Sequence, residues 1–206
     1  MRRGWILGLA VAALLAVGAK EAVRVRQPVV AGIFYPAERN KLLAAVEIYT
    51  EDAKVPELPG RYVACITPHS AFPYSGEVAA HAFRALQPGQ YDRVIVLASS
   101  HFAWFEGCSI PMVQFYRTPL GDVELDGPAI ARLQMCPLID TRAILSPRVK
   151  RFRDGSRRLP LHEVEYSIET VLPFLQARLG RFKLVPVVVG SFEGRDEKPD
   201  NNAIRA

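Results

Sequence analysis

Cysteine is scarce in this sequence, and its spacing excludes two kinds of small-domain scaffold. Only three cysteines, Cys65, Cys108 and Cys136, occur among the 206 residues. An odd number without paired spacing indicates neither a disulfide framework nor a zinc ribbon. Cys65 lies within an apolar run and is interpreted as a small core residue.

The sequence also has no stretch in which basic and aromatic residues alternate, so it gives no strong nucleic-acid signal. Internal repeats and low-complexity tracts are absent as well. What is present, 50% hydrophobic and 23% charged residues, is typical of a globular domain. The net charge is +5, and part of it comes from a basic cluster at residues 148–158. That cluster could bind phosphate or nucleic acid, but we interpret it as a solvated loop.

The N-terminus has the three-part layout of a secretory signal. Two arginines near the start precede an apolar run from Ile6 to Val17, and small residues follow before Lys20. The run is shorter than the roughly 20 apolar residues that a spanning helix needs, so we expect cleavage and export to the periplasm or the exterior. The alternative is an uncleaved segment that anchors the protein in a membrane through residues 5–19.

Strand and helix patterns alternate along the rest of the chain. The runs 62–67 and 93–99 are short, β-branched and almost wholly apolar, which predicts buried strands, and 76–87 between them has helical spacing. This order predicts a right-handed βαβ unit. Further helices are expected at 40–52, 127–134 and 164–180, the last kinked at Pro173. Further strands are expected at 108–116, 122–126 and 183–190. The fold class is therefore α/β, with a mixed or mostly parallel sheet flanked by helices.

The chain divides into three parts by this interpretation. Residues 1–22 form the signal or anchor, 23–191 form one α/β domain, and 192–206 form a polar tail for which we expect disorder. No apolar face in that tail could cover the strand at 183–190. This strand therefore lies at an edge, or the domain is incomplete at its C-terminus, and we favour incompleteness.

Two histidines follow the predicted strands at equivalent positions. His69 comes after the strand at 62–67, and His101 comes after the strand at 93–99. Ligands of open α/β sheets bind beyond the carboxyl ends of the strands, so both imidazoles are predicted at one rim. Two neutral imidazoles suit iron, zinc or copper. The alternative is that each histidine is a loop residue bonded to backbone.

A third group of candidates opens the predicted helix at 164–180. His162, Glu165 and Tyr166 have the spacing of one helix face, where a carboxylate and an imidazole can bind a metal ion or exchange protons. The alternative is that the acidic residues here stabilise a helix N-terminus.

Six motifs, in order, resemble the Memo family, also called the AmmeMemoRadiSam system protein B family. The motifs are QPVVAGIFYP (27–36), PHSAFPYSG (68–76), SSHF (99–102), YRTPLGDVELD (116–126), HEVEYSIETVLPFLQ (162–176) and LVPVVVG (184–190). The resemblance covers about residues 24–191. It implies a fold similar to the class III, extradiol-type non-haem dioxygenases, with a metal-binding cleft at the strand ends. The family's motif histidines match His69 and His101.

The sequence departs from the family pattern at three places. The family's Pro-His-Ala-Gly-Tyr has Ser70, Ala71 and Phe72 at its last three positions here, and a non-glycine residue at 71 restricts the backbone. The family's Glu-His-Ser has Tyr166 at its centre. Family members also continue beyond the strand at 183–190, into a segment that carries a cysteine associated with the site in some relatives.

Two functions follow from these patterns. The first is a Memo-like metal cleft, with iron as the expected metal and copper or zinc as alternatives, held by His69, His101 and Glu165. As an enzyme it would be a metal-dependent oxidoreductase of an unknown small-molecule substrate, with His162 or Tyr166 as the acid–base group. The second is a non-catalytic metal- or ligand-binding protein that keeps the fold with a degenerate site.

Overall fold

The computed structural model describes residues 22–56, 60–140 and 159–190. The basic cluster at 148–158, the tail at 192–206 and all but the last residue of the predicted signal or anchor lie outside these ranges, so those interpretations remain predictions. Within the described ranges, no helix is long and apolar enough to cross a membrane.

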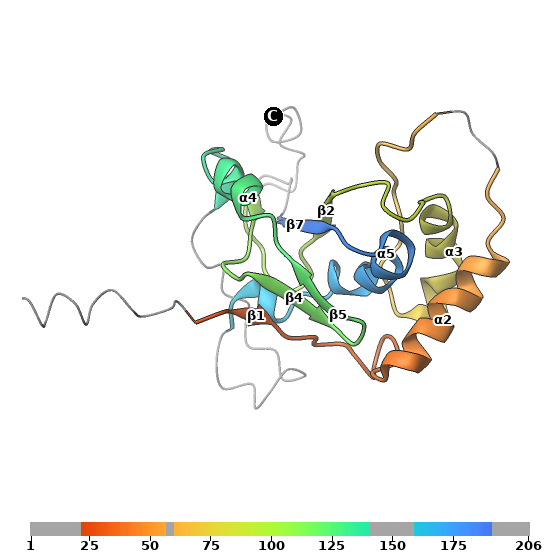
Figure 1. Ribbon diagram of the computed structural model, residues 1–206. Helices are drawn as coiled ribbons and strands as arrows, with labels where there is room; N and C mark the ends of the chain where they lie inside the picture. The colour runs from red at the N-terminus through yellow and green to blue at the C-terminus, as the bar shows by residue number, and fades with distance from the viewer. Residues whose placement is uncertain (1–21, 57–59, 141–158, 191–206) are drawn as a thin grey trace, which may run out of the picture.

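Two small sheets form the centre of the molecule (Figure 1). The first has the strand order β1–β4–β5, and the second has the order β2–β7–β3–β6. Their bounds are β1 Val25–Arg26, β2 Arg93–Ser99, β3 Cys108–Ser109, β4 Phe115–Thr118, β5 Gly121–Glu124, β6 Ile139–Asp140 and β7 Lys183–Val189. β2 runs parallel to β7, whereas β3 runs antiparallel to β7. A single bridge between Leu125 and Leu184 joins the two sheets.

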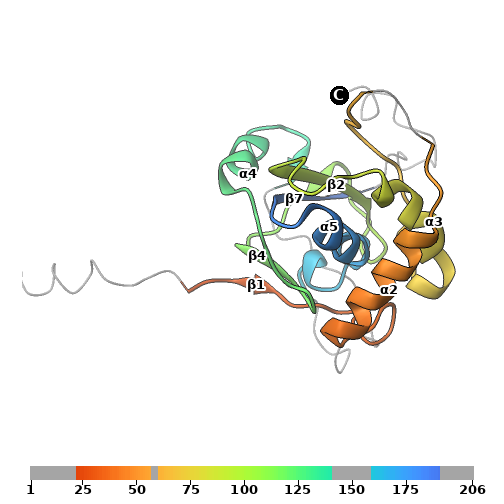
Figure 2. The ribbon, with the colours of Figure 1, turned by 45° about the vertical axis from the view of Figure 1, so that its right-hand side comes forward.

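The helices lie on two sides of these sheets. They are α2 Arg39–Asp52, α3 Phe72–Arg84, α4 Gly127–Leu133 and α5 Leu172–Leu179, with 3₁₀ turns η1 Leu161–Glu163 and η2 Glu169–Val171. Figures 1 and 2 show α2, α3 and α5 grouped on one side and α4 on the other. The α/β fold with mixed sheets and flanking helices is therefore confirmed, although two sheets replace the single predicted one.

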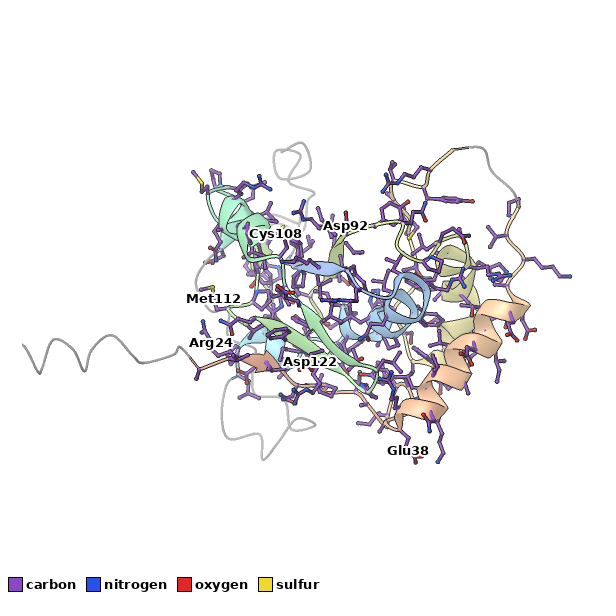
Figure 3. The ribbon with its side chains drawn as sticks, viewed as in Figure 1. Arg24, Glu38, Asp92, Cys108, Met112 and Asp122 are labelled. Atoms are coloured by element: carbon purple, nitrogen blue, oxygen red, sulfur yellow. The ribbon has the colours of Figure 1, made fainter. Side chains whose placement is uncertain are left out.

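The core of the helical side is aromatic. Phe174 of α5 packs against Phe83 of α3 with ring centroids 5.2 Å apart, and against Phe72 at 4.9 Å. Gly76, also in α3, faces Tyr49 of α2 so closely that a Cβ atom there would lie 2.8 Å from the tyrosine ring. Figure 3 shows side chains filling the space between helices and sheets, with Glu38 at the periphery.

The predicted strand at 62–67 is wrong. The structure describes no strand there, and Val63 and Ile66 are almost fully exposed. Side-chain hydrogen bonds, and not the backbone hydrogen bonds of a sheet, hold this segment in place. The Tyr91 hydroxyl donates to the Tyr62 carbonyl, and Arg61 Nη2 donates to the Gln90 carbonyl at 2.6 Å. The predicted βαβ unit is therefore loop, helix and strand. Cys65, expected in the core, is exposed.

The long helix predicted at 164–180 is also wrong in extent. A 3₁₀ turn at η2 leads directly into α5, which begins at Leu172. Pro173 lies in the first turn of α5, where its missing N–H costs no intrahelical hydrogen bond. Proline therefore starts this helix and does not kink it, and His162, Glu165 and Tyr166 lie before it.

Candidate metal centre

The loop after β2 carries His101. Its first residue, Ser100, extends the pairing with β7 through a bond from its N–H to the Val189 carbonyl at 2.9 Å. The Ser100 hydroxyl then donates to the Ala103 carbonyl at 2.6 Å, which closes a tight turn around the intervening histidine. His101 is therefore presented at the end of β2 by a turn with little freedom.

The second histidine, His69, lies just before α3. Its carbonyl accepts a hydrogen bond from Thr170 Oγ1 at 3.0 Å, and the Phe72 N–H donates to the Phe34 carbonyl at 2.8 Å. Ala71 is the N-cap of α3 with φ −62° and ψ 145°, an ordinary extended conformation. The departure from the family's glycine at this position is thus accommodated without strain.

The two imidazoles meet edge to edge. The Nε2 atoms of His69 and His101 lie 3.3 Å apart, and the ring planes are inclined at 68°. Burial and the neighbouring His101 both lower the pKa of His69, so its ring is neutral at pH 7. Two histidines that are 32 residues apart in sequence thus direct the same ring nitrogen at one point.

Glu165 fixes the orientation of His101. The buried carboxylate lies 2.8 Å from His101 Nδ1 through Oε1 and accepts the His101 N–H through Oε2 at 2.6 Å. Burial acts to raise the pKa of Glu165, but the hydrogen bonds from His101 and from the Ser167 N–H outweigh it and lower the pKa. An ionised carboxylate only accepts, so Nδ1 of His101 holds the proton and Nε2 presents its lone pair.

Tyr166 forms the face on which His101 rests. The two rings stack with centroids 4.7 Å apart and planes inclined at 19°. Phe34 and Phe102 pack against Tyr166 in T-shaped arrangements, with ring centroids 4.7 and 5.8 Å from the Tyr166 centroid. Tyr166, at the position of the family's additional histidine, therefore acts as an aromatic support for His101.

His162 lies in a different environment. Its side chain is buried, and Nδ1 lies at hydrogen-bonding distance, 2.9 Å, from the Tyr116 hydroxyl. Burial, and then the nearby Arg26 guanidinium, lower the pKa of His162 to about 4. The structure therefore brings His69, His101, Glu165 and Tyr166 together, while His162 is a neutral interior group that contacts Tyr116.

A buried ion pair supports the Glu165 loop from behind, and the sequence patterns did not indicate it. Arg26 Nη1 binds Glu169, and its other nitrogens donate to the carbonyls of His162 and Glu165. Glu169 also accepts from Tyr35 and from the N–H groups of Val29 and Val30. Arg26 and Glu169 are 143 residues apart in the sequence, so their spacing could not predict the pair. The one available signal was an acidic residue at a helical position where burial is expected.

No group of three or more His, Cys, Asp or Glu side chains placed to hold a metal ion occurs in the part of the chain that the structure describes. The candidate centre is thus a pair of imidazoles with a carboxylate behind one of them. Glu165 as a third ligand remains a prediction, and its present hydrogen bonds do not favour it.

Comparison with known proteins gives consistent matches. The family described as Memo-like protein matches residues 26–204. A MEMO1 family protein of Pyrobaculum arsenaticum is 30% identical over 81% of this chain and 57% of its own length. Protein memo-1 homolog of Caenorhabditis elegans is 33% identical over 84% and 45%, and Protein MEMO1 of Danio rerio is 30% identical over 82% and 52%. The chain spans about half the length of these relatives.

Proposed function

The chain belongs to the Memo family, and from that premise we propose that His69 and His101 bind a divalent metal ion, with iron first and copper or zinc as alternatives. The separation of the two Nε2 atoms carries the proposal. Imidazole nitrogens lie about 2.0–2.1 Å from a tetrahedral metal ion, which places two such nitrogens roughly 3.3 Å from each other. The observed separation is 3.3 Å.

The electrostatics of the pair support the same proposal. Glu165 keeps the Nδ1 proton on His101, so that the Nε2 lone pair is available without a change of tautomer. The pKa of His69 is lowered by burial and by the neighbouring His101, so this ring is neutral at pH 7. His69 can therefore act as a ligand without losing a charge on binding.

A redox-active ion bound here would supply activation of oxygen or water for a metal-dependent oxidoreductase, whose substrate we infer to be a small molecule. The residues of the chain have separable roles in this proposal. Glu165 orients His101, and Tyr166 holds the imidazole plane. Tyr166 is also the proposed proton donor, because its phenol ring is adjacent to the pair. His162 is assigned a supporting role, because its ring is buried against Tyr116.

The second candidate is a binding protein that holds a metal or a small ligand without turnover. One observation favours it: Tyr166 occupies the position where the resemblance places an additional histidine, so the described residues supply two imidazoles at this point. Two neutral protein ligands leave most of the coordination sphere to water or to a bound molecule.

Metal content of the purified protein tests the proposal. Protein loaded anaerobically with Fe(II), then desalted, is expected to retain close to one equivalent, and a His69→Ala, His101→Ala variant is expected to retain little. His81→Ala is the matched control, because His81 is exposed on α3 and its Nδ1 lies 2.9 Å from the Glu77 carbonyl of its own helix. Equal iron in all three proteins would refute the metal centre. Retained iron without oxygen consumption across a substrate panel would favour the binding protein.

A further inference from the structure

A pocket lies where three helices end, and its lining does not include the histidine pair. It has a volume of about 1030 Å³ and is lined by the segment after α2, the last turn of α3 and the last turn of α5. These helices are neighbours in both ribbon views (Figures 1 and 2). The polar lining includes Lys54, Arg84, Gln87 and Arg178.

The pocket is strongly basic. Lys54, Arg84 and Arg178 line it, and among the residues that the structure describes no carboxylate does. No salt bridge found within the described ranges involves any of the three. Burial lowers the pKa of Arg178, and the neighbouring Arg84 charge lowers it further. The Arg84 and Arg178 guanidinium groups thus repel one another.

The helix ends offset only part of this charge. The C-terminus of a helix is equivalent to about half a negative charge, so three of them offset roughly half of three cations. The pocket therefore keeps an excess of positive charge, which attracts an anion.

Arg178 is held in a fixed position. Its Nη2 atom donates to the carbonyls of Arg84 at 3.2 Å and Leu86 at 2.8 Å, at the end of α3. Its Nε atom is buried and has no hydrogen-bond partner among the described residues. A planar guanidinium fixed by two carbonyls matches the geometry of a phosphate or carboxylate.

The lining also includes apolar and aromatic side chains, among them Val55, Pro56 and Tyr62. The Tyr62 carbonyl accepts from the Tyr91 hydroxyl, and the preceding Arg61 lies over the Tyr91 ring at 4.6 Å. The pocket thus combines three cationic side chains with apolar ones.

We propose that this pocket binds a small organic phosphate. Arg84, Arg178 and Lys54 contact the phosphate group. The side chains of Val55, Pro56 and Tyr62 contact the organic part. The site is separate from the proposed metal centre, and its lining shares no residue with that centre.

Calorimetric titration tests the proposal with phenyl phosphate, inorganic phosphate and phenol as probes, in low-salt buffer with a chelator. Phenyl phosphate is expected to bind, inorganic phosphate to bind more weakly, and phenol not to bind. Affinity is expected to fall as salt is added, because the contacts are ionic. Equal affinity for phenyl phosphate and inorganic phosphate would refute the apolar contact, and no binding of either would refute the site.

Substitutions locate the binding. Arg84→Gln and Lys54→Gln are each expected to weaken phenyl phosphate binding about tenfold, as expected for loss of a charged hydrogen bond. Arg132→Gln in α4 removes the same charge from an exposed position elsewhere and is expected to have little effect. If all three variants weakened phenyl phosphate binding equally, the effect would come from the net charge of the protein, and the proposed pocket would be refuted. The His69→Ala, His101→Ala variant is expected to bind phenyl phosphate normally, so the two proposals fail independently.

Discussion

The two sides of the histidine pair differ in how they are held. Behind the pair, Arg26, Glu165 and Glu169 are almost fully buried and exchange a dense set of hydrogen bonds. In front of it, residues 61–69 run largely exposed and outside any sheet. His101 belongs to the first region and His69 to the second. The difference teaches that one imidazole is preorganised by the interior, whereas the other is fixed mainly through its own backbone.

The largest expected effect is on the buried region. Glu169→Gln leaves the Arg26 charge in the interior without its partner, which typically costs about 3–5 kcal/mol of unfolding free energy. Urea denaturation measures it. The matched control is Glu38→Gln, whose partner Lys41 is exposed, and its expected cost is below about 1 kcal/mol. A similar, small cost for both changes would contradict the contrast between the two regions.

Acid should act on the same buried region. The pKa of His162 is about 4 in the folded protein, against 6.5 unfolded, so the unfolded chain binds the extra proton first as the pH falls. Stability is therefore full above pH 6.5 and decreases towards pH 4, by roughly 3 kcal/mol from this group. The lowered pKa of Glu165 acts in the same direction at the acid end.

Denaturation curves at several pH values measure this loss. His162→Gln removes the histidine contribution, so its stability should vary less between pH 6.5 and 4 than that of the unaltered protein. The same dependence in both would show that His162 does not titrate as described.

The interior should also control metal affinity through His101. Glu165→Gln keeps the shape of the side chain but removes the charge that holds the Nδ1 proton. Loss of such a partner behind a ligating histidine typically weakens metal binding about 10–100-fold. Competition against a chelator measures the affinity, and circular dichroism checks the fold. Unchanged affinity in a folded variant would argue that His101 needs no carboxylate.

The smallest expected effect is at the aromatic support. Tyr166→Phe keeps the ring that stacks on His101, so metal affinity should change by less than about threefold. Tyr166→Leu removes the stacked ring, and we expect the free energy of metal binding to become less favourable by about a further 0.5–1.5 kcal/mol, the value of an aromatic pair. The same chelator competition applies. A large loss with phenylalanine would assign the hydroxyl, and not the ring, as the important group.

Periodicity was sufficient to predict the fold class, but not every element. The strands at 93–99 and 183–190 were predicted because buried parallel strands are continuous apolar runs, and both form as a parallel pair. The predicted burial holds for β7 but is wrong for β2, where Ile95 and Leu97 are exposed. The run at 62–67 has the same composition and forms no strand, because a strand also needs a neighbour to pair with, and sequence composition does not show the neighbour. The sequence predicted that Pro173 would interrupt a helix, but not that the helix would begin there. The reason is that the preceding residues form a 3₁₀ turn, which the helical spacing did not indicate.

Part of the site could be predicted as well. The position of His101 after β2 was correct, and the structure does bring His69 beside it. His69 arrives there through the start of α3, however, and not from the end of a strand. The contacts of Glu165 and Arg26 could not be predicted, because they join segments that are 64 and 139 residues apart.

We expect few residue types to be tolerated at Gly76, for a reason that is unrelated to either proposed function. Even alanine at this position would bring a methyl group to 2.8 Å from the Tyr49 ring, so the ring or the two helices would have to shift. Tyr49 also donates to the Phe72 carbonyl at the start of α3. A mutational scan should therefore find position 76 intolerant, with compensating changes at position 49, even though neither residue touches a metal ion or a phosphate.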